Sequence, residues 1–245
     1  MCTVTIVPYD RGVRLFSNRD ERRTRPAGLP PERHDLGPRR ALFPMDPRGG
    51  GTWAGVNDAG LIVALLNVTA PASSLRDRRT RSRGLIALEL LRSDSMRVAI
   101  ETARALHADA FEPFRALVVH AGRLAVATAQ ANGTLQLTVR PLDAPVLFTS
   151  SSLGDAVVEP PRRRLFERMV LRAHGGWLDG QARFHDHQWL QRPDISVRME
   201  RADALTVSRT RIDVTRDCRH LQYQAPVTLG TCGSVRQATT CCSLL

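Results

Sequence analysis

The sequence contains no lysine: all 35 basic residues are arginines, and they outnumber the 24 acidic residues to give a formal net charge of +11. Aromatic residues make up only 5% of the chain. A strong positive charge is typical of nucleic-acid-binding proteins. The arginines are nevertheless spread along the whole chain, and so few aromatic residues argue against a base-stacking platform. We therefore expect no nucleic-acid partner.

Long apolar segments are also missing. No run approaches the roughly 18 apolar residues that a transmembrane helix needs. The N-terminus lacks the basic stretch followed by an apolar one that marks a secretory signal peptide. The hydrophobic content of 42% is ordinary for a globular protein. We expect no membrane span and a cytoplasmic location.

No C-x-x-C pair occurs, which argues against a zinc ribbon. The five cysteines are Cys2, Cys218, Cys232, Cys241 and Cys242. An odd number of cysteines without a secretion signal indicates reduced thiols rather than a disulfide framework.

His185 and His187 are separated by one residue, a spacing that occurs in metal sites. Two imidazoles do not make a site, and the sequence offers no obvious third ligand. We therefore expect no metal here and place both histidines in an exposed polar loop. The pair is also the first candidate for iron ligation if the chain binds haem.

Short runs rich in β-branched and apolar residues, bounded by turn residues, predict many strands. These predicted strands cover residues 3–8, 13–17, 52–56, 61–67, 115–120, 123–129, 134–140, 145–149, 195–199, 205–214 and 219–223. Apolar residues at helical spacing predict helices over 83–92, 95–107 and 162–174.

The order of these elements indicates the fold class. Tight turns join most neighbouring strands, so we expect antiparallel sheets. Helices clustered beside such sheets indicate an α+β layered fold. Residues 22–50 are rich in proline, arginine and glycine and should be mostly loop. We expect a single domain over residues 1–225 and a flexible tail over residues 226–245.

Cys2 directly follows the initiator methionine and opens the first predicted strand. Removal of Met1 would place a thiol and a free α-amine, whose pKa is about 8, on one residue, so that the amine could take the thiol proton. The predicted hairpin returns beside Cys2, where Arg19 would favour the thiolate and Asp20 would hold the α-ammonium. The alternative is a small apolar filler beside a solvated ion pair. The register of the hairpin decides between them.

Trp53 follows the run Gly49-Gly50-Gly51. Glycines let the backbone approach a ligand, so Trp53 is a candidate pocket wall, and a core tryptophan is the alternative. No Gly-Lys-Ser/Thr follows the glycines, which excludes a P-loop.

Three stretches together resemble the NRDE family, also called the transport and Golgi organisation family. They read MCTVTIVP, LFSNRDERRTRP and GGGTWAGVNDAGLIVALLNV. TSSSLGD and PPRRRLFE resemble the bacterial members. More distantly, MCT and GVNDAGLIVALLN resemble the choloylglycine hydrolases and penicillin V acylases. Those enzymes are cysteine N-terminal-nucleophile hydrolases that cleave non-peptide amide bonds, and the resemblance implies their four-layer αββα sandwich.

The resemblance also assigns roles to residues. Cys2 matches the nucleophile, Arg19 and Asp20 match charged residues of the active site, and Asn67 matches an asparagine beside the substrate carbonyl. The acylases place an oxyanion-hole asparagine after a threonine, where this chain has Thr149 followed by Ser150.

Further residues are expected to bind substrate. They are Asn18, Trp53, Thr149 and Arg209. Arg209 is included because the acylases use a late arginine, which here could meet a carboxylate substrate.

Two functions follow from this resemblance. The first is a cysteine N-terminal-nucleophile hydrolase that acts on a small linear amide without a cofactor. The second is a non-catalytic protein on the same scaffold that binds haem or an acyl lipid, with Cys2 as a possible iron ligand. The oligomeric state stays open.

Overall fold

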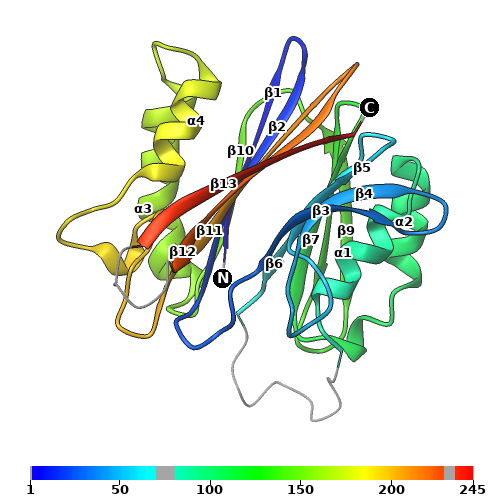
Figure 1. Ribbon diagram of the computed structural model, residues 1–245, viewed down its shortest axis with the longest axis horizontal. Coiled ribbons are helices and arrows are strands. Elements are labelled where there is room, and N and C mark those ends of the chain that lie inside the picture. Colours follow the sequence, from blue (N-terminus) through cyan, green and yellow to red (C-terminus); the bar gives the residue numbers. More distant parts are fainter. Residues whose placement is uncertain (1, 70–80, 229–234, 245) are drawn as a thin grey trace.

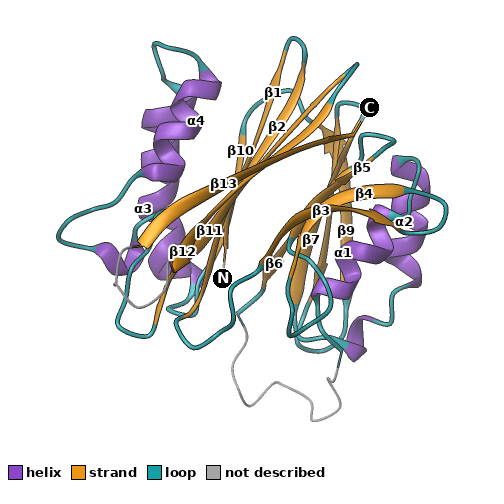
Figure 2. Ribbon diagram, viewed as in Figure 1, coloured by secondary structure: helices purple, strands orange, loops and turns teal. Residues whose placement is uncertain are grey.

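Two antiparallel sheets lie face to face between two layers of helices in the computed structural model, which describes residues 2–69, 81–228 and 235–244 (Figures 1 and 2). The six-stranded sheet has the order β10 (Val146–Ser150), β1 (Cys2–Tyr9), β2 (Gly12–Arg22), β11 (Ala204–Thr215), β12 (Arg219–Thr228) and β13 (Val235–Leu244). The seven-stranded sheet has the order β3 (Leu29–Asp35), β4 (Arg40–Met45), β5 (Ala54–Asn57), β6 (Ile62–Asn67), β7 (Phe114–His120), β8 (Arg123–Ala129) and β9 (Leu135–Pro141).

Each sheet is covered on its outer face by helices (Figure 2). On the seven-stranded sheet these are α1 (Gly84–Leu91) and α2 (Met96–Ala105), followed by the 3-10 turn η2 (Ala108–Ala110). On the six-stranded sheet they are α3 (Asp155–Phe166), the π-helical turn η3 (Glu167–Leu171) and α4 (Trp177–Asp186), with the 3-10 turn η4 (Pro193–Ile195) further along the chain. The result is the predicted four-layer α+β sandwich. No helix in the described ranges is both long and apolar enough to cross a membrane.

Strand β1 shows that both faces of the six-stranded sheet are buried. Val4 and Ile6 belong to the apolar cluster between the two sheets, whereas Val7 packs in the cluster under α3 and α4. Because successive side chains of a strand point to opposite faces, Cys2 shares the inter-sheet face with Val4 and Ile6. Thr3 and Thr5 therefore point toward the helices.

The secondary structure differs from the sequence predictions in three places. Residues 22–50 contain two strands that were not predicted, β3 and β4. Strand β3 was not predicted because it contains Pro30 and Pro31. It is an edge strand, where a missing backbone N–H is tolerated. The predicted strand 195–199 is replaced by η4 and irregular chain. Within the predicted flexible tail from residue 226, β12 continues to Thr228 and β13 pairs along it, while residues 229–234 and 245 lie outside the described residues.

The third helix also differs from its prediction. It begins at Asp155 rather than Arg162, so Pro160 and Pro161 lie inside α3. The chain then continues through η3 to α4, which was not predicted as a helix. Gly180 explains the close packing here: a Cβ at this position would lie 2.1 Å from the carbonyl oxygen of Met169.

Candidate active site

Cys2 is the first residue of β1, which lies between β10 and β2 in the six-stranded sheet. Its Cα partners are Arg19 on β2 and Ser150 on β10, so all three side chains share the inter-sheet face. The thiol residue is buried, and its backbone N–H donates to Ser150 Oγ at 3.2 Å. The hairpin therefore brings Arg19 beside Cys2, as its turn predicted.

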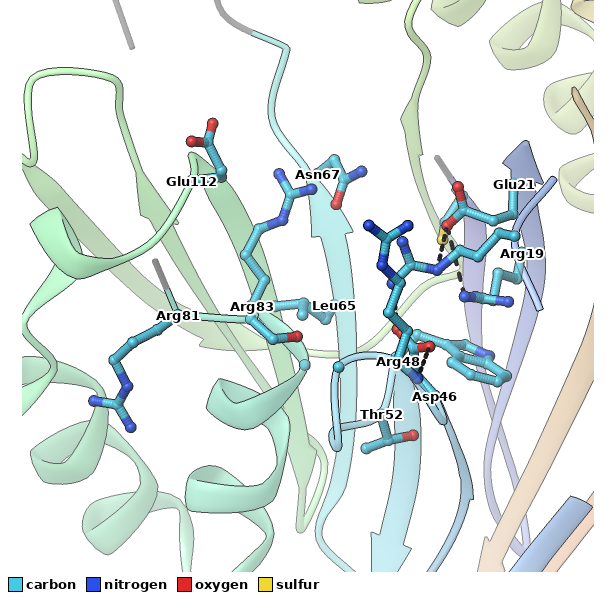
Figure 3. A pocket seen from close by; sticks show the side chains of 16 residues that line it. Arg19, Glu21, Asp46, Arg48, Thr52, Leu65, Asn67, Arg81, Arg83 and Glu112 are labelled. Atoms are coloured by element: carbon cyan, nitrogen blue, oxygen red, sulfur yellow. Dashed lines mark hydrogen bonds and ion pairs between the residues drawn. The ribbon is translucent and has the colours of Figure 1, made fainter. Parts of the chain in front are cut away.

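A cavity of about 600 Å³ opens beside Cys2 (Figure 3). Its wall comes from β1, β2, β6, the β4–β5 loop and the segment that leads into α1. The lining residues are Cys2, Arg19, Glu21, Arg25, Asp46, Arg48, Gly49, Thr52, Trp53, Leu65, Asn67, Arg81, Ser82, Arg83, Gly84 and Glu112. Most of these side chains are polar or charged, so the cavity is suited to a polar molecule.

Arg19 links the two sheets at the floor of this cavity. Its guanidinium lies 4.3 Å from the ring centroid of Trp53, which precedes β5 in the other sheet. Its Nη2 lies 3.6 Å from Glu21 Oε2. Arg19 is only 5% exposed, and its Nη1 has no hydrogen-bond partner among the described residues. Trp53 is thus a pocket wall that holds a catalytic candidate in place.

Asp20 occupies the opposite face of β2, toward the helices. Its Oδ1 accepts a hydrogen bond of 2.6 Å from Thr206 Oγ1. Burial raises the pKa of Asp20, although the Arg162 guanidinium, the Thr206 hydrogen bond and the terminal amino group act to lower it.

The Cys2 thiol is held in its protonated form. Burial raises the pKa of Cys2 above its ordinary value, and the terminal amino group and Arg19 only partly oppose this. Arg19 therefore acts in the predicted direction, but desolvation outweighs it. A buried thiol of this kind needs a base to remove its proton at the moment of attack.

Asn67 shares the cavity with Cys2, whereas Ser150 contacts the backbone nitrogen of Cys2. Asn67 ends β6 and lines the cavity, where its carboxamide faces the open space (Figure 3). Ser150 is buried, and its hydroxyl oxygen contacts the backbone nitrogen of Cys2 rather than lining the cavity.

Three residues expected to bind substrate lie on the wrong face of the sheet. Asn18 Nδ2 donates to the carbonyl oxygens of His185 and Val197, at 2.8 and 2.9 Å. Thr149 and Arg209 also point toward the helices that cover this sheet, and each makes a polar contact with a helix residue. Arg162 Nη1 lies 2.8 Å from Thr149 Oγ1, and Arg209 Nη1 lies 2.9 Å from Asp186 Oδ1. A shift of one residue along a strand reverses the face, and the sequence alone did not determine that register.

His185 is fully buried at the end of α4, so the predicted exposed loop is wrong for this residue. Asn18 uses its amide to donate to two carbonyls, so its Oδ1 accepts from His185 Nδ1–H at 2.9 Å. His185 Nε2 then accepts from the Thr5 hydroxyl at 2.6 Å. This network assigns the neutral ring, and burial places the pKa of His185 well below its ordinary value. The described residues contain no group of three metal-ligating side chains.

Sequence reasoning missed several residues of the cavity wall and one buried residue behind it. The missed wall residues include Glu21, Arg25, Asp46, Arg48, Arg83 and Glu112. The glycine run Gly49-Gly50-Gly51 was used to predict only the role of Trp53, although glycines also allow a close backbone contact with a second segment. A Cβ at Gly51 would lie 2.2 Å from the carbonyl carbon of Gly84, so this loop packs against the start of α1 and brings Arg83 to the cavity.

Arg162 is the missed residue behind the sheet. It is 1% exposed, and it donates to Thr3 Oγ1 and Thr149 Oγ1, both at 2.8 Å, and to two backbone carbonyls. Thr3 and Thr149 are the chain neighbours of Cys2 and Ser150. Arg162 therefore ties together the two strands that carry these residues.

Comparison with known proteins agrees with this architecture. The family model described as Transport and Golgi organisation 2 matches residues 1–162, which is more than half of the chain. The chain belongs to this family. A search of curated protein sequences gave no significant match.

Solved structures similar to this member of the Transport and Golgi organisation 2 family include an acid amidase orthologue and a bile acid hydrolase. The Caenorhabditis elegans orthologue of N-acylethanolamine-hydrolyzing acid amidase aligns with a TM-score of 0.62 at 12% identity, covering 86% of this chain and 92% of that one. A mutant conjugated bile acid hydrolase from Clostridium perfringens aligns with a TM-score of 0.54 at 12% identity, covering 97% of this chain and 92% of that one. At this identity the likeness shows the fold alone, and it agrees with the predicted four-layer sandwich.

Proposed function

We propose that the protein is a cysteine N-terminal-nucleophile hydrolase that cleaves a non-peptide linear amide bond. The observation that carries the proposal is the position of Cys2. Its thiol lies at a polar cavity and its backbone nitrogen lies against Ser150, with Arg19 directly opposite on the neighbouring strand. The proposal requires that Met1 is removed, so that this nitrogen becomes a free amine.

The chemistry then uses a single residue as nucleophile and base. The α-amine of Cys2 takes the thiol proton as the sulfur attacks the amide carbonyl, and an S–C bond forms. The same proton passes to the leaving nitrogen as the C–N bond breaks, which releases an amine and leaves a thioester. Water adds to the thioester, and the acid product leaves as the thiol is restored. The raised pKa of the thiol, caused by burial, makes this internal base necessary.

Neighbouring side chains supply positioning and charge stabilisation. Asn67 is the proposed oxyanion donor, because its carboxamide lines the same cavity as Cys2. Ser150 orients the α-amine through its hydroxyl, and Asp20 stabilises the ammonium form by its charge. Arg19, held by Trp53, stabilises negative charge that develops at the sulfur.

The charged wall favours this function over the binding of haem or an acyl lipid. Among the side chains lining the cavity, Leu65 and Trp53 offer the largest apolar surfaces, and charged groups surround them. His185, a candidate iron ligand, is fully buried behind the sheet and bound to Asn18 and Thr5. No cofactor is therefore included in the proposal.

The test combines intact mass with substrate turnover. We expect the purified protein to lack Met1 and to hydrolyse short acyl p-nitroanilides, with the acyl group trapped on the Cys2 peptide. Cys2→Ser, a change of one atom, should lower the rate by at least about 10³-fold, and Asn67→Ala by about 10²-fold. Retention of Met1, or turnover that is unchanged in Cys2→Ser, would overturn the proposal.

A further inference from the structure

The wall of the Cys2 cavity carries more arginines than carboxylates. Five arginines line it, against the three acidic residues Glu21, Asp46 and Glu112. The acidic residues are not shared evenly among the arginines. Arg25 forms an ion pair with Asp46 and a second one, at 3.5 Å, with Glu21. Glu21 also meets Arg19. Two of the three carboxylates are thus used on one side of the cavity.

Arg48 and Arg83 lack such counter-ions. No carboxylate of the described residues lies within ion-pair distance of either guanidinium. Arg83 is half-buried, and its Nη1 donates to the carbonyl oxygen of Pro113 at 3.1 Å. Burial lowers the pKa of Arg83, and Glu112 and Cys2 are the first negative groups that oppose this effect.

The two arginines come from different elements and line one cavity. Arg48 comes from the β4–β5 loop and Arg83 from the residue before α1, and both side chains extend into the cavity that Asn67 also lines (Figure 3). Arg81 lines the same wall but points away from this centre, with its guanidinium 5.1 Å from the ring centroid of Phe111. The unpaired positive charge is therefore concentrated in the cavity that holds the proposed oxyanion donor.

A planar guanidinium binds carboxylate and phosphate oxygens through paired N–H groups, so two unpaired arginines in a recess form a site for such a group. We infer that the substrate of the Cys2 site carries an oxyanion, a carboxylate or a phosphate, which Arg48 and Arg83 bind. The inference rests on the proposed function for the identity of the reacting bond. The charge of the recess can be tested without any turnover.

Two alkylating probes of nearly the same shape make that test. Iodoacetate is negatively charged and iodoacetamide is neutral, and both alkylate a thiol by displacement of iodide. Their rates at Cys2 are measured by mass spectrometry of the N-terminal peptide, and the rate ratio is compared with that of a free peptide of sequence CTVTIVPY. A cleft lined by positive charge should raise the iodoacetate-to-iodoacetamide ratio about tenfold above that of the peptide, and salt should reduce it.

The variants locate the effect. Arg48→Gln and Arg83→Gln should each lower the ratio about threefold, and the double variant should approach the peptide. The iodoacetamide rate of each variant serves as an internal control for folding. Arg104→Gln, an exposed arginine on α2, should leave the ratio unchanged. The inference would be overturned if the wild-type ratio equalled that of the peptide, or if the ratio of the double variant equalled that of the wild type.

Matched substrates identify the anion and separate the two claims. N-butyrylethanolamine is neutral, whereas N-butyrylglycine carries a carboxylate and N-butyryl-O-phosphoethanolamine a phosphate. The kcat/KM of at least one charged amide should be about tenfold higher than that of the neutral amide. This preference should be lost in the variant that carries both Arg48→Gln and Arg83→Gln. Faster turnover of the neutral amide would overturn the inference and leave the hydrolase standing. If no amide is hydrolysed, the hydrolase proposal fails, and the alkylation ratio still decides the anion site.

Discussion

The guanidinium of Arg19 lies over the indole of Trp53, with 4.3 Å between the guanidinium carbon and the ring centroid. Arg19 belongs to β2 of the six-stranded sheet, and Trp53 precedes β5 of the seven-stranded sheet. The contact therefore joins the two central layers next to Cys2. It also explains how a cation that is 95% buried keeps its place without a full ion pair, because the indole face attracts positive charge.

The first prediction concerns this contact. Trp53→Phe keeps an aromatic face, whereas Trp53→Leu removes it. We expect kcat/KM, or the alkylation rate of Cys2, to fall about 5- to 30-fold in the leucine variant and less in the phenylalanine variant. Urea unfolding of both variants separates this effect from lost packing. Equal rates in the two variants would show that the ring face does not position Arg19.

Arg162 offers a second prediction. Arg162→Met removes a buried cation that donates to two hydroxyls and two carbonyls, and should lower the free energy of unfolding by about 3–5 kcal/mol. Arg162 is also the first group that lowers the pKa of Asp20 against the effect of burial. Without this charge the pKa of Asp20 should rise further, so the acid limb of the pH–rate profile should move to higher pH.

Arg162→Lys distinguishes charge from packing. The lysine keeps the charge but lacks the planar fork, so it should restore the acid limb without restoring full stability. Arg164→Met, on the exposed side of the same helix, is the matched control and should change neither quantity. An acid limb that stays at the wild-type pH in Arg162→Met would contradict the link between Arg162 and Asp20.

The third prediction is a pH dependence of stability at His185. Burial depresses its pKa well below 6.5 in the native state, so the native protein keeps this ring neutral. Below about pH 6.5 the unfolded chain binds a proton that the native state does not, and stability falls with pH by up to about 1.4 kcal/mol per unit. The loss continues down to the native pKa. Above pH 6.5 the ring is neutral in both states and has no effect.

His185→Gln should remove this contribution to the slope, although it also lowers stability at neutral pH by breaking the bonds to Asn18 and Thr5. The measurement is urea unfolding at pH 7.5 and 5.5 for both proteins. The difference between the two pH values should be about 1 kcal/mol smaller in the variant. An identical difference in the two proteins would show that His185 titrates normally.

The fourth prediction uses adjacent glycines. Gly51→Ala would place a Cβ 2.2 Å from the backbone of Gly84, so it should cost about 1–3 kcal/mol of stability and displace Arg83. Gly50→Ala meets no atom within 4 Å and carries only the strain of φ +65°, about 1 kcal/mol. Activity on an anionic amide should fall in the first variant and persist in the second. Equal losses would contradict the proposed role of the Gly51–Gly84 contact.

The sequence by itself determined the strand-rich order and the antiparallel hairpins, including the one that returns beside Cys2. These features depend on neighbours in the chain: alternation along β1 and a tight turn at Asp10-Arg11 are local properties that bring two strands together. The hidden edge strand β3 and the helix α4 escaped prediction because prolines and weak periodicity obscured them.

Only the tertiary structure decided which residues share the cavity. Asn18, Thr149 and Arg209 lie within one residue of inward-facing positions, yet their side chains contact the helix layer because the face alternates at every residue. Arg48 and Arg83 are distant in sequence and line the same cavity because the β4–β5 loop packs against the start of α1. Local patterns predict the strands, but the chemistry of the site depends on which faces the sheets present to each other.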